Sequence, residues 1–328
     1  MTDLKQNEGG KFSGDRPSFA ATILVSALFV LGFQDALVKT ISPDVSLWQF
    51  QLVRSLFNTI LIITVMLVSS SQIIEFKPNR IGPVALRGFL QCAAMCFFFG
   101  AIPFLSLAEV AAGLYVFPLF VAILSVVILN EKVGPKRISA IFLGFIGTLL
   151  ILKPGTDSFK FISVLPILAA LCYAGSILTV RHLCREESSV TLALSVSLWL
   201  IVIGGIMTAL LTLVPLNNVD VQWAYLSSGW YVLGWGTVVL ILVCAVFNTF
   251  SNILLARAYQ VAEASWLAPF DYSYLIFATF WGWVFWNHIP DFFTLFGMFL
   301  IACAGAFVSW REGQDHRFAH TPAKDSSE

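Results

Sequence analysis

The stretch that decides the fold covers residues 108–155 and reads AEVAAGLYVFPLFVAILSVVILNEKVGPKRISAIFLGFIGTLLILKPG. A related stretch covers residues 262–305 and reads AEASWLAPFDYSYLIFATFWGWVFWNHIPDFFTLFGMFLIACAG. Each begins with an Ala-Glu pair, continues as an apolar run that holds a proline, turns after an asparagine, and ends in an apolar run that holds two glycines. Both have the composition of membrane helices, so the sequence predicts a duplicated set of such helices.

The composition of the whole chain places it in a lipid bilayer. Of its 328 residues 58% are hydrophobic and 12% are charged, and the mean hydropathy is +0.84. A soluble globular domain carries about 25% charged residues, so this chain has roughly half the usual charge. Its formal net charge of zero gives no reason to expect nucleic acid as a partner.

The apolar runs predict an all-α integral membrane protein with ten transmembrane helices, because about 20 apolar residues cross a hydrocarbon core about 30 Å thick. Residues 18–155 hold the first five helices and residues 160–311 the other five. Short polar segments, 1–17 and 312–328, are predicted to be disordered tails. The predicted spans are Phe19–Thr40, Ser46–Ser69, Leu86–Ser106, Glu109–Asn130, Arg137–Leu152, Ile162–His182, Val190–Val214, Tyr231–Ala256, Ala264–Trp286 and Asp291–Trp310.

The positive charges predict how these spans are oriented. If the N-terminus is cytoplasmic, fifteen of the nineteen Lys and Arg residues fall in segments on the cytoplasmic side and three in the outer loops. Cytoplasmic loops of membrane proteins carry such an excess. The expected location is the inner membrane of a bacterium, with both termini in the cytoplasm.

No motif in the sequence predicts an enzyme, a cofactor or a metal site. The chain has no Gly-x-Ser-x-Gly elbow and no His-Glu-x-x-His pair, and these are the patterns that carry hydrolytic chemistry. The six cysteines lie within or at the ends of spans, and Cys92 and Cys96 have no histidine or further cysteine nearby to complete a metal site. Apolar packing is the simplest interpretation of these cysteines. A channel or a receptor is a further alternative, but neither explains the duplication as well as a carrier does.

A known family has the same motifs in the same order. The first half supplies Leu86-Arg87-Gly88, Leu105-Ser106-Leu107-Ala108-Glu109, Pro118-Leu119-Phe120, Asn130-Glu131-Lys132-Val133, Gly144-Phe145-Ile146-Gly147 and Lys153-Pro154-Gly155. The second supplies Ala256-Arg257-Ala258, Ala262-Glu263-Ala264, Pro269-Phe270-Asp271-Tyr272, Gly297 and Gly305. Over about residues 18–311 the chain resembles the EamA-type branch of the drug/metabolite transporter superfamily. It departs from the family pattern at Asp271, where Glu is more usual, and at His288, where a Glu would mirror Glu131.

The resemblance implies two inverted five-helix repeats around a central cavity that opens alternately to each side. It also implies a secondary active transporter for a small amphipathic metabolite, such as an amino acid or a derivative with an aromatic or cationic part. Export is favoured because most characterised relatives of this kind export. The alternative is an uptake permease for a metabolite such as S-adenosylmethionine or riboflavin. Coupling to protons and the choice between monomer and homodimer are left open.

Charged residues inside the spans are the first candidates for the site, because a lone charge at mid-bilayer costs about 2.5–3.5 kcal/mol. Asp271 follows Pro269, and a proline there can leave a carbonyl exposed to a cavity. In one interpretation Asp271 binds a cationic group of the substrate or a coupling proton. In the other it is a structural strut that an Arg or Tyr neutralises.

A second group of charges lies near the outer ends of the first two spans. Asp35 and Lys39 are four residues apart, a spacing that suits an ion pair within one helix, and Gln34 adjoins them. Arg54 either attracts a substrate carboxylate or completes a gate with Asp35. The structural alternative, which we favour, has these charges neutralise one another while Lys39 extends to the interface.

Uncharged polar and aromatic side chains complete the predicted substrate site. Gln91, Asn248 and Asn252 could bond a ligand or join neighbouring helices. The aromatic candidates lie in spans that the resemblance places around the cavity, and they suit a ring or a quaternary cation, although lipid-facing or packing roles are the commoner use of such residues. They are Tyr115, Tyr173, Trp266 and Tyr272, with Trp199 and Tyr274 in the same spans.

Prolines and glycines predict where helices bend and where they touch. Pro118 and Pro269 lie in matching helices of the two halves and are the predicted hinges. Gly144, Gly147, Gly297 and Gly305 allow close helix packing, within the chain or between protomers. Glu109 and Glu263 open their helices, where a carboxylate suits the positive end of the helix dipole and caps free amides.

Overall fold

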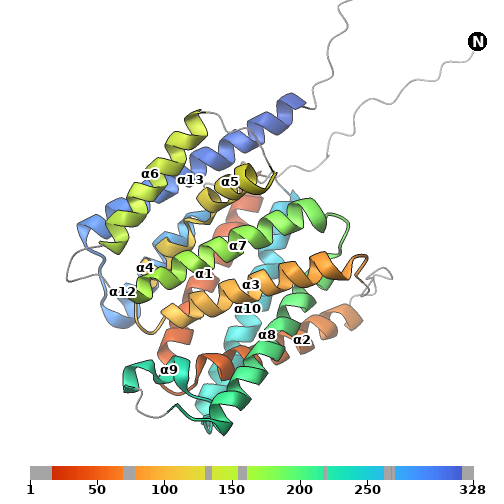
Figure 1. Cartoon of the computed structure of the whole chain (residues 1–328), viewed down its shortest axis with the longest axis vertical. Coiled ribbons are helices and arrows are strands. Elements are labelled where there is room, and N and C mark those ends of the chain that lie inside the picture. The colour runs from red at the N-terminus through yellow and green to blue at the C-terminus, as the bar shows by residue number, and fades with distance from the viewer. Residues whose placement is uncertain are drawn as a thin grey trace, which may run out of the picture.

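The computed structural model describes residues 17–68, 78–129, 135–153, 161–216, 220–261, 267 and 270–319, and every regular element in these ranges is a helix (Figure 1). The elements are α1 (Pro17–Ile41), α2 (Leu47–Val68), α3 (Ile81–Ala101), α4 (Leu107–Leu114), α5 (Phe117–Leu129), α6 (Pro135–Leu152), α7 (Val164–Leu183), α8 (Ser189–Leu213), α9 (Ala224–Ser227), α10 (Trp235–Val261), α12 (Ser273–Trp286) and α13 (Phe292–Ala319). Short 3₁₀ turns precede α7 and α9, at Phe161–Ser163 and Val221–Trp223.

Within these ranges, six stretches are long and apolar enough to cross a membrane. They are Ser18–Ile41, Ile81–Ala101, Leu107–Ile128, Phe161–Leu183, Ser189–Leu213 and Trp235–Ala258. Shorter apolar helices cover Phe142–Leu152, Ser273–Trp286 and Phe292–Ala304. An all-helical fold with apolar helices of membrane length is therefore confirmed.

Several predicted boundaries differ from the structure, and the eighth span, placed at 231–256, corresponds to α10 at Trp235–Val261. The third span was placed at 86–106, whereas α3 begins five residues earlier and ends at Ala101. Pro83 is tolerated in the first turn of a helix, and Pro103 would break a helix that continued past Ala101. The C-terminal tail was predicted to be disordered from residue 312, but α13 continues to Ala319, since Arg, Glu and Gln in this stretch favour helix.

Ser106 begins α4 through a reciprocal capping arrangement. Its hydroxyl accepts a hydrogen bond from the Glu109 backbone N–H at 3.2 Å, and the Glu109 carboxylate accepts one from the Ser106 backbone N–H at 2.8 Å. This pair satisfies two amides that the first turn of a helix leaves open. The predicted capping role of Glu109 is confirmed, whereas Glu263 lies outside the described residues.

Replacing this cap should weaken the fold by a modest amount. We expect Ser106→Ala to lower the free energy of unfolding by about 1 kcal/mol, the usual cost of losing a Ser cap. The measurement is the thermal unfolding midpoint of purified protein in detergent. Ser227→Ala is the matched control, since that hydroxyl donates to the Trp223 carbonyl one turn before it and caps no helix N-terminus. Equal midpoints for the two variants would contradict the capping role.

The fourth predicted span is broken in the structure. α4 ends before a turn at Tyr115 and Val116, and α5 starts at Phe117 with Pro118 in its first turn. Pro118 has no backbone N–H to bond the preceding turn, which explains a break at this position. A second interruption lies at Tyr272, just before α12. Pro269, the other predicted hinge, lies outside the described residues.

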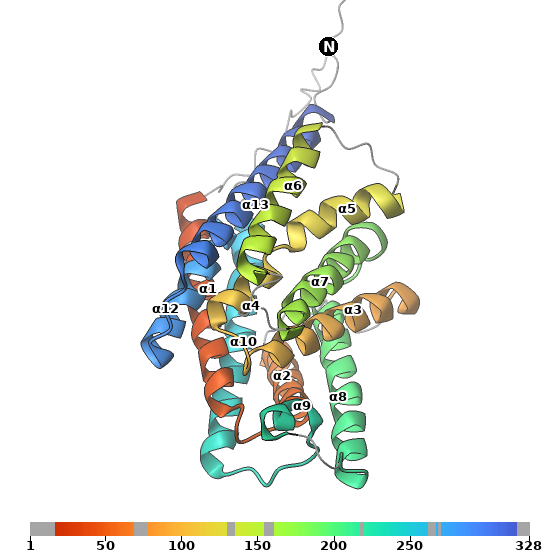
Figure 2. The ribbon, with the colours of Figure 1, turned by 60° about the vertical axis from the view of Figure 1, so that its left-hand side comes forward.

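Glycines let α6 and α13 approach each other closely, and the two helices run side by side in both views (Figures 1 and 2). A Cβ added to Gly147 would lie 2.8 Å from the Gly297 carbonyl oxygen, and one added to Gly297 would lie 2.6 Å from the Gly147 carbonyl oxygen. Gly144 faces Leu119 on α5 in the same way. These glycines therefore serve packing within one chain.

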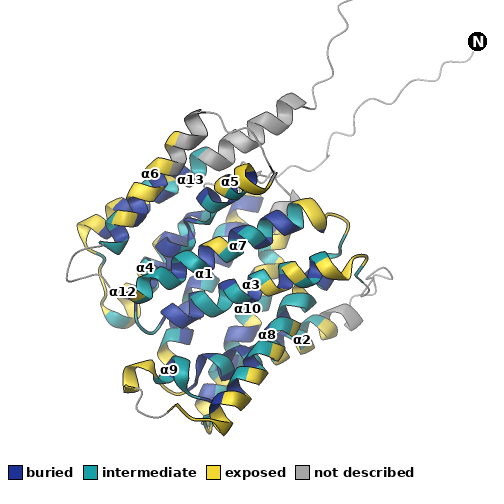
Figure 3. Cartoon of the chain, in the orientation of Figure 1, coloured by how far each residue is buried: buried dark blue, intermediate teal, exposed yellow. Residues whose placement is uncertain are grey.

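Side chains at the outer faces of the bundle are apolar. On α8 the exposed side chains recur every three or four residues, which places them on one face of the helix. They are Leu198, Val202, Ile206, Leu210 and Leu213. Figure 3 shows exposed residues on outward helix faces and buried ones where helices meet. An apolar exterior of this kind suits contact with lipid tails.

Polar contacts join loops that are far apart in the sequence. The Lys153 ammonium lies 2.6 Å from a carboxylate oxygen of Asp291, and this bond, together with those from Thr294, lowers the pKa of Asp291. At the opposite ends of the helices, the backbone N–H groups of Asn79 and Arg80 donate to the Glu187 carboxylate. In each of these two contacts, the joined loops are ones that the predicted topology places on the same side of the membrane.

Candidate functional site

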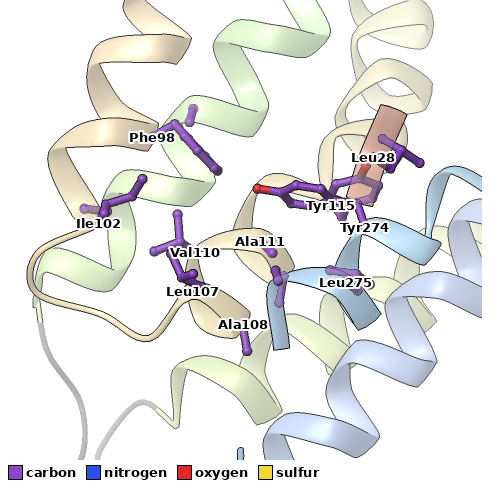
Figure 4. Packing of buried hydrophobic residues seen from close by; sticks show 14 of the residues in the cluster. Leu28, Phe98, Ile102, Leu107, Ala108, Val110, Ala111, Tyr115, Tyr274 and Leu275 are labelled. Atoms are coloured by element: carbon purple, nitrogen blue, oxygen red, sulfur yellow. The ribbon is translucent and has the colours of Figure 1, made fainter. Parts of the chain in front are cut away.

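Aromatic rings gather where α4, α5, α7 and α12 meet. Tyr115 stacks on Tyr274 with ring centres 5.3 Å apart and planes 13° apart, and it lies 5.5 Å from Tyr272 (Figure 4). Tyr173 lies 4.9 Å from Phe117, which is 6.0 Å from Tyr115. We call Tyr115, Phe117, Tyr173, Tyr272 and Tyr274 the aromatic cluster. The structure thereby brings together four aromatic candidates, Tyr115, Tyr173, Tyr272 and Tyr274, from distant parts of the sequence.

Asp35 of α1 joins this cluster. It is 5% exposed, the Tyr274 hydroxyl donates to its Oδ2, and the Gln34 side-chain amide donates to its Oδ1 at 3.3 Å. Tyr115 and Tyr274 lie among Leu28, Ala111 and Leu275 in Figure 4. A carboxylate held by a phenol at the edge of stacked rings can accept a proton or a cationic group.

Asp271 lies near two other rings of the same cluster. It is partly buried and close enough to Tyr173 and Tyr272 to act on both electrostatically. It also precedes the interruption at Tyr272 directly. Two carboxylates, from α1 and from the segment before α12, therefore flank one set of aromatic rings. Trp266, a further candidate, lies outside the described residues.

Arg54 of α2 is buried, with 2% of its surface exposed. Its Nη2 donates to Gln51 Oε1 at 2.7 Å, and the guanidinium carbon lies 4.9 Å from the ring centre of Phe50 and 4.4 Å from that of Phe99. Its Nε and Nη1 have no hydrogen-bond partner among the residues that the structure describes. A buried ion without a partner costs several kcal/mol, so this arrangement is unusual for a purely structural group.

Both charged residues of the predicted ion pair within α1 contact groups on other elements. Asp35 accepts from Tyr274 and Gln34, while the Lys39 ammonium donates to the Leu105 carbonyl and lies 5.2 Å from the ring centre of Trp286. The helical spacing allowed a pair, but partners on α12 and after α3 are better placed. Asp35 and Arg54 lie within electrostatic range of each other, and the mutual neutralisation of Asp35, Lys39 and Arg54 that we favoured stays a prediction.

The amide candidates separate into different environments. Asn58 of α2 donates to Asn248 Oδ1 at 3.4 Å, which links α2 to α10. Asn252 is exposed and donates to the Asn248 carbonyl of its own helix, so it faces away from the aromatic cluster. Gln91 of α3 is buried, and its Oε1 has no partner among the described residues.

Several residues around Arg54 were missed by the sequence analysis. Gln51 and Phe50 lie three and four residues before Arg54 on α2, and helical spacing alone could have found them. Phe99 and Tyr225 come from distant segments and carry no such signal. Tyr225 is buried on α9 and lies within electrostatic range of Arg54.

The Tyr274 bond to Asp35 makes a testable contribution to stability. Tyr274→Phe should lower the free energy of unfolding by about 1.5–3 kcal/mol, the range for a hydrogen bond to a charged group. Thermal unfolding measures it, with Tyr231→Phe as control, because that hydroxyl bonds only the neutral Ser228 hydroxyl. In a double-mutant cycle with Asp35→Asn the two effects should be non-additive; simple additivity would show that the bond is not formed.

Apolar spans, lipid-facing side chains and a polar centre define a multi-pass membrane protein. A model of the EamA-like transporter family matches residues 18–153 and again residues 160–310. The chain therefore belongs to the EamA-like transporter family.

Individual relatives are similar at lower identity. The riboflavin transporter of Rhizobium johnstonii is 29% identical over 61% of this chain and 61% of its own length. The pseudopaline exporter CntI of Pseudomonas aeruginosa is 25% identical over 86% of this chain and 93% of its own. The S-adenosylmethionine uptake transporter of Rickettsia prowazekii is 23% identical over 90% and 93%. One crystal structure shares the fold with a TM-score of 0.54 and 16% identity, over 89% of this chain and 97% of that one.

These matches indicate a bacterial transporter of the drug/metabolite type rather than an enzyme. The names of the relatives include both export and uptake, and they name chemically different solutes. Family membership fixes the class of protein but leaves its substrate and direction to be argued from the site.

Proposed function

We propose that this chain is a secondary active transporter that moves a small amphipathic metabolite across the bacterial inner membrane by alternating access. Residues 18–155 and 160–311 would form two inverted five-helix repeats around a central path. The observation that carries this proposal is the pattern of helix contacts.

That pattern is what an exchange of the two halves would produce. Each helix of the first half has a counterpart in the second: α7 for α1, α8 for α2, α10 for α3, α12 for α4 and α5, and α13 for α6. If every helix is replaced by its counterpart, the α1–α10 contact becomes the α7–α3 contact. The same replacement turns α2–α10 into α8–α3, and α1–α12 into α7–α4 and α7–α5. The contacts α2–α8, α6–α13 and α4–α12 map onto themselves. All of these pairs are in contact, which supports an internal pseudo-two-fold axis.

The aromatic cluster lies where such an axis would pass. Tyr115 ends α4, Tyr272 precedes α12, and both positions interrupt the fourth helix of their half. Interrupted helices at the repeat interface are where secondary transporters bind their solutes. We therefore place the substrate site at the aromatic cluster, with Gln34, Gln91 and Asn248 as further polar candidates and the interruptions near Pro118 and Pro269 as the hinges.

The chemistry of this site suggests the substrate class. Tyrosine rings accept an aromatic ring or a quaternary cation, and Asp35 and Asp271 suit an ammonium group. These features favour an amino acid or a derivative with an aromatic or cationic part. We favour export, as in the pseudopaline exporter; uptake of a solute such as S-adenosylmethionine or riboflavin is the alternative that other relatives' names support.

Coupling to one proton would supply enough energy. One charge that crosses 100 mV gains about 2.3 kcal/mol, which sustains a gradient of about 40-fold. Asp35 or Asp271 would carry that proton. A monomer suffices for this scheme because Gly147 and Gly297 are used within the chain; a homodimer is the alternative.

Purified protein in liposomes tests the proposal. A panel of radiolabelled amino acids and derivatives would be screened by counterflow, in which trapped unlabelled solute drives uptake of labelled solute. A carrier gives saturable counterflow, whereas a channel gives flux that does not saturate. Reporter fusions in residues 215–230 test the topology, and a signal on the side of the termini would overturn the ten-helix scheme with its cytoplasmic ends.

A further inference from the structure

The guanidinium of Arg54 presents donors that nothing in the described structure uses. Nε carries one N–H and Nη1 two, and both atoms are buried without an acceptor. The side-chain nitrogen of Gln51, a residue that is 1% exposed, is unpartnered as well. Gln51 accepts from Arg54 Nη2, and its own amide nitrogen lies near the Cys96 thiol and has no stronger acceptor among the described residues.

No carboxylate of the described residues forms a hydrogen bond or an ion pair with Arg54. The ionisable groups within electrostatic range are Asp35, Tyr225, Cys96 and Cys244. Asp35 is the one carboxylate among them, and its oxygens take bonds from Tyr274 and Gln34 instead. The site thus combines a fixed positive charge with surplus donors. A fixed charge inside a membrane protein is expected to serve solute or ion binding.

We propose that Arg54 and Gln51 bind the carboxylate of the transported solute. This inference rests on the proposed transport function and adds a second subsite to the aromatic cluster. The cluster would hold the ring or cationic part, and Arg54 the acid group. Asp35 connects the two, because it bonds Tyr274 of the cluster and lies in the field of Arg54.

The surroundings favour an organic monoanion over an inorganic ion. A planar guanidinium fork matches the two oxygens of a carboxylate. Phe50 and Phe99 cover the guanidinium with apolar rings 5.6 Å apart, and such walls suit a solute with a hydrocarbon body. The nearby charge of Asp35 would repel a dianion such as hydrogen phosphate more strongly than a single carboxylate.

Matched ligands test the subsite in purified wild-type protein. Thermal unfolding would be followed by tryptophan fluorescence in chloride-free sulfate buffer with benzoate, 3-phenylpropanoate and phenylalanine, each compared with its own amide. We expect carboxylates to raise the unfolding midpoint and their amides to raise it less or not at all. Chloride added alone should give no shift. Equal shifts for all acids and amides, no shift from any acid, or a shift that chloride reproduces would overturn the proposal.

Variants at Arg54 give a second test, in which the stability of the ligand-free protein and its affinity for carboxylates should change in opposite directions. Arg54→Met removes a buried charge that has no ion-pair partner among the described residues, so it should raise the midpoint of ligand-free protein while it weakens carboxylate binding about 10- to 100-fold, the effect of losing a charged hydrogen bond. Arg54→Lys should keep part of the binding. Arg185→Met is the control, because that arginine is exposed and bonds only the Arg181 carbonyl of the preceding turn. A lower ligand-free midpoint for Arg54→Met would mark a structural strut and overturn the subsite.

Failure of this subsite and failure of the transport proposal give different results. If wild-type protein shows saturable counterflow and Arg54→Met transports the same solute with unchanged KM, the transporter stands and the subsite falls. If carboxylates stabilise the wild-type protein and not Arg54→Met, yet no solute gives counterflow, the binding site stands and the transport proposal falls.

Discussion

Gly297→Leu should leave little folded protein. A Cβ at this position would lie 2.6 Å from the Gly147 carbonyl oxygen and 2.7 Å from the Ile151 side chain, and real Cβ atoms do not approach backbone so closely. A leucine adds further atoms in the same direction, so α6 and α13 would have to separate. Because each helix ends one half of the chain, their separation would remove the contact that closes the bundle at this side.

A graded series makes this expectation quantitative. Gly297→Ala should lower the free energy of unfolding by about 1–3 kcal/mol through overpacking, although alanine favours helix by about 1 kcal/mol over glycine. Gly236→Ala is the matched control, since a Cβ there meets nothing within 4 Å, and it should be neutral or slightly stabilising. The measurements are the monodisperse fraction in size-exclusion chromatography and the unfolding midpoint. A fully folded Gly297→Leu protein would show that the two helices do not touch at this point.

The features that the sequence predicted correctly are those that depend on residues close together along the chain. Apolar runs of membrane length gave the positions of the helices, and the place of Glu109 at the start of its helix indicated a cap that the structure forms. Proline chemistry also explains the break before Pro118. The shifted start of α3 shows the limit of this reasoning, because Ile81, Gly82 and Pro83 form a helical turn that propensity alone would not favour.

Partners across the fold could not be predicted in this way. Helical spacing paired Asp35 with Lys39, yet Tyr274, far away in sequence, holds the carboxylate. Asn248 and Asn252 share a helix, but one bonds α2 and the other is exposed. Which side chains meet depends on the crossing angles of the helices and on the rotation of each helix about its axis. The hydrophobic periodicity of a single span predicts neither of these.

Asp271→Asn should abolish net transport while the protein inserts and folds normally. The residue lies beside Tyr173 and Tyr272, at the interruption before α12. Asparagine has nearly the same shape, so packing should persist, but it can neither carry a proton nor attract a cation. If Asp271 is the proton carrier, the gradient of about 40-fold that one charge sustains across 100 mV should disappear.

Three measurements separate this role from a structural one. Net solute accumulation in proteoliposomes under a proton gradient should fall to background in Asp271→Asn, whereas Asp271→Glu should keep activity because it retains the carboxyl group. Asp220→Asn, at an exposed position before α9, should transport as wild type does. If counterflow survives in Asp271→Asn while accumulation is lost, Asp271 couples the proton; if both are lost, it binds the solute as well. Wild-type accumulation in Asp271→Asn would remove this carboxylate from the mechanism and leave Asp35, bonded to Tyr274, as the buried acid of the path.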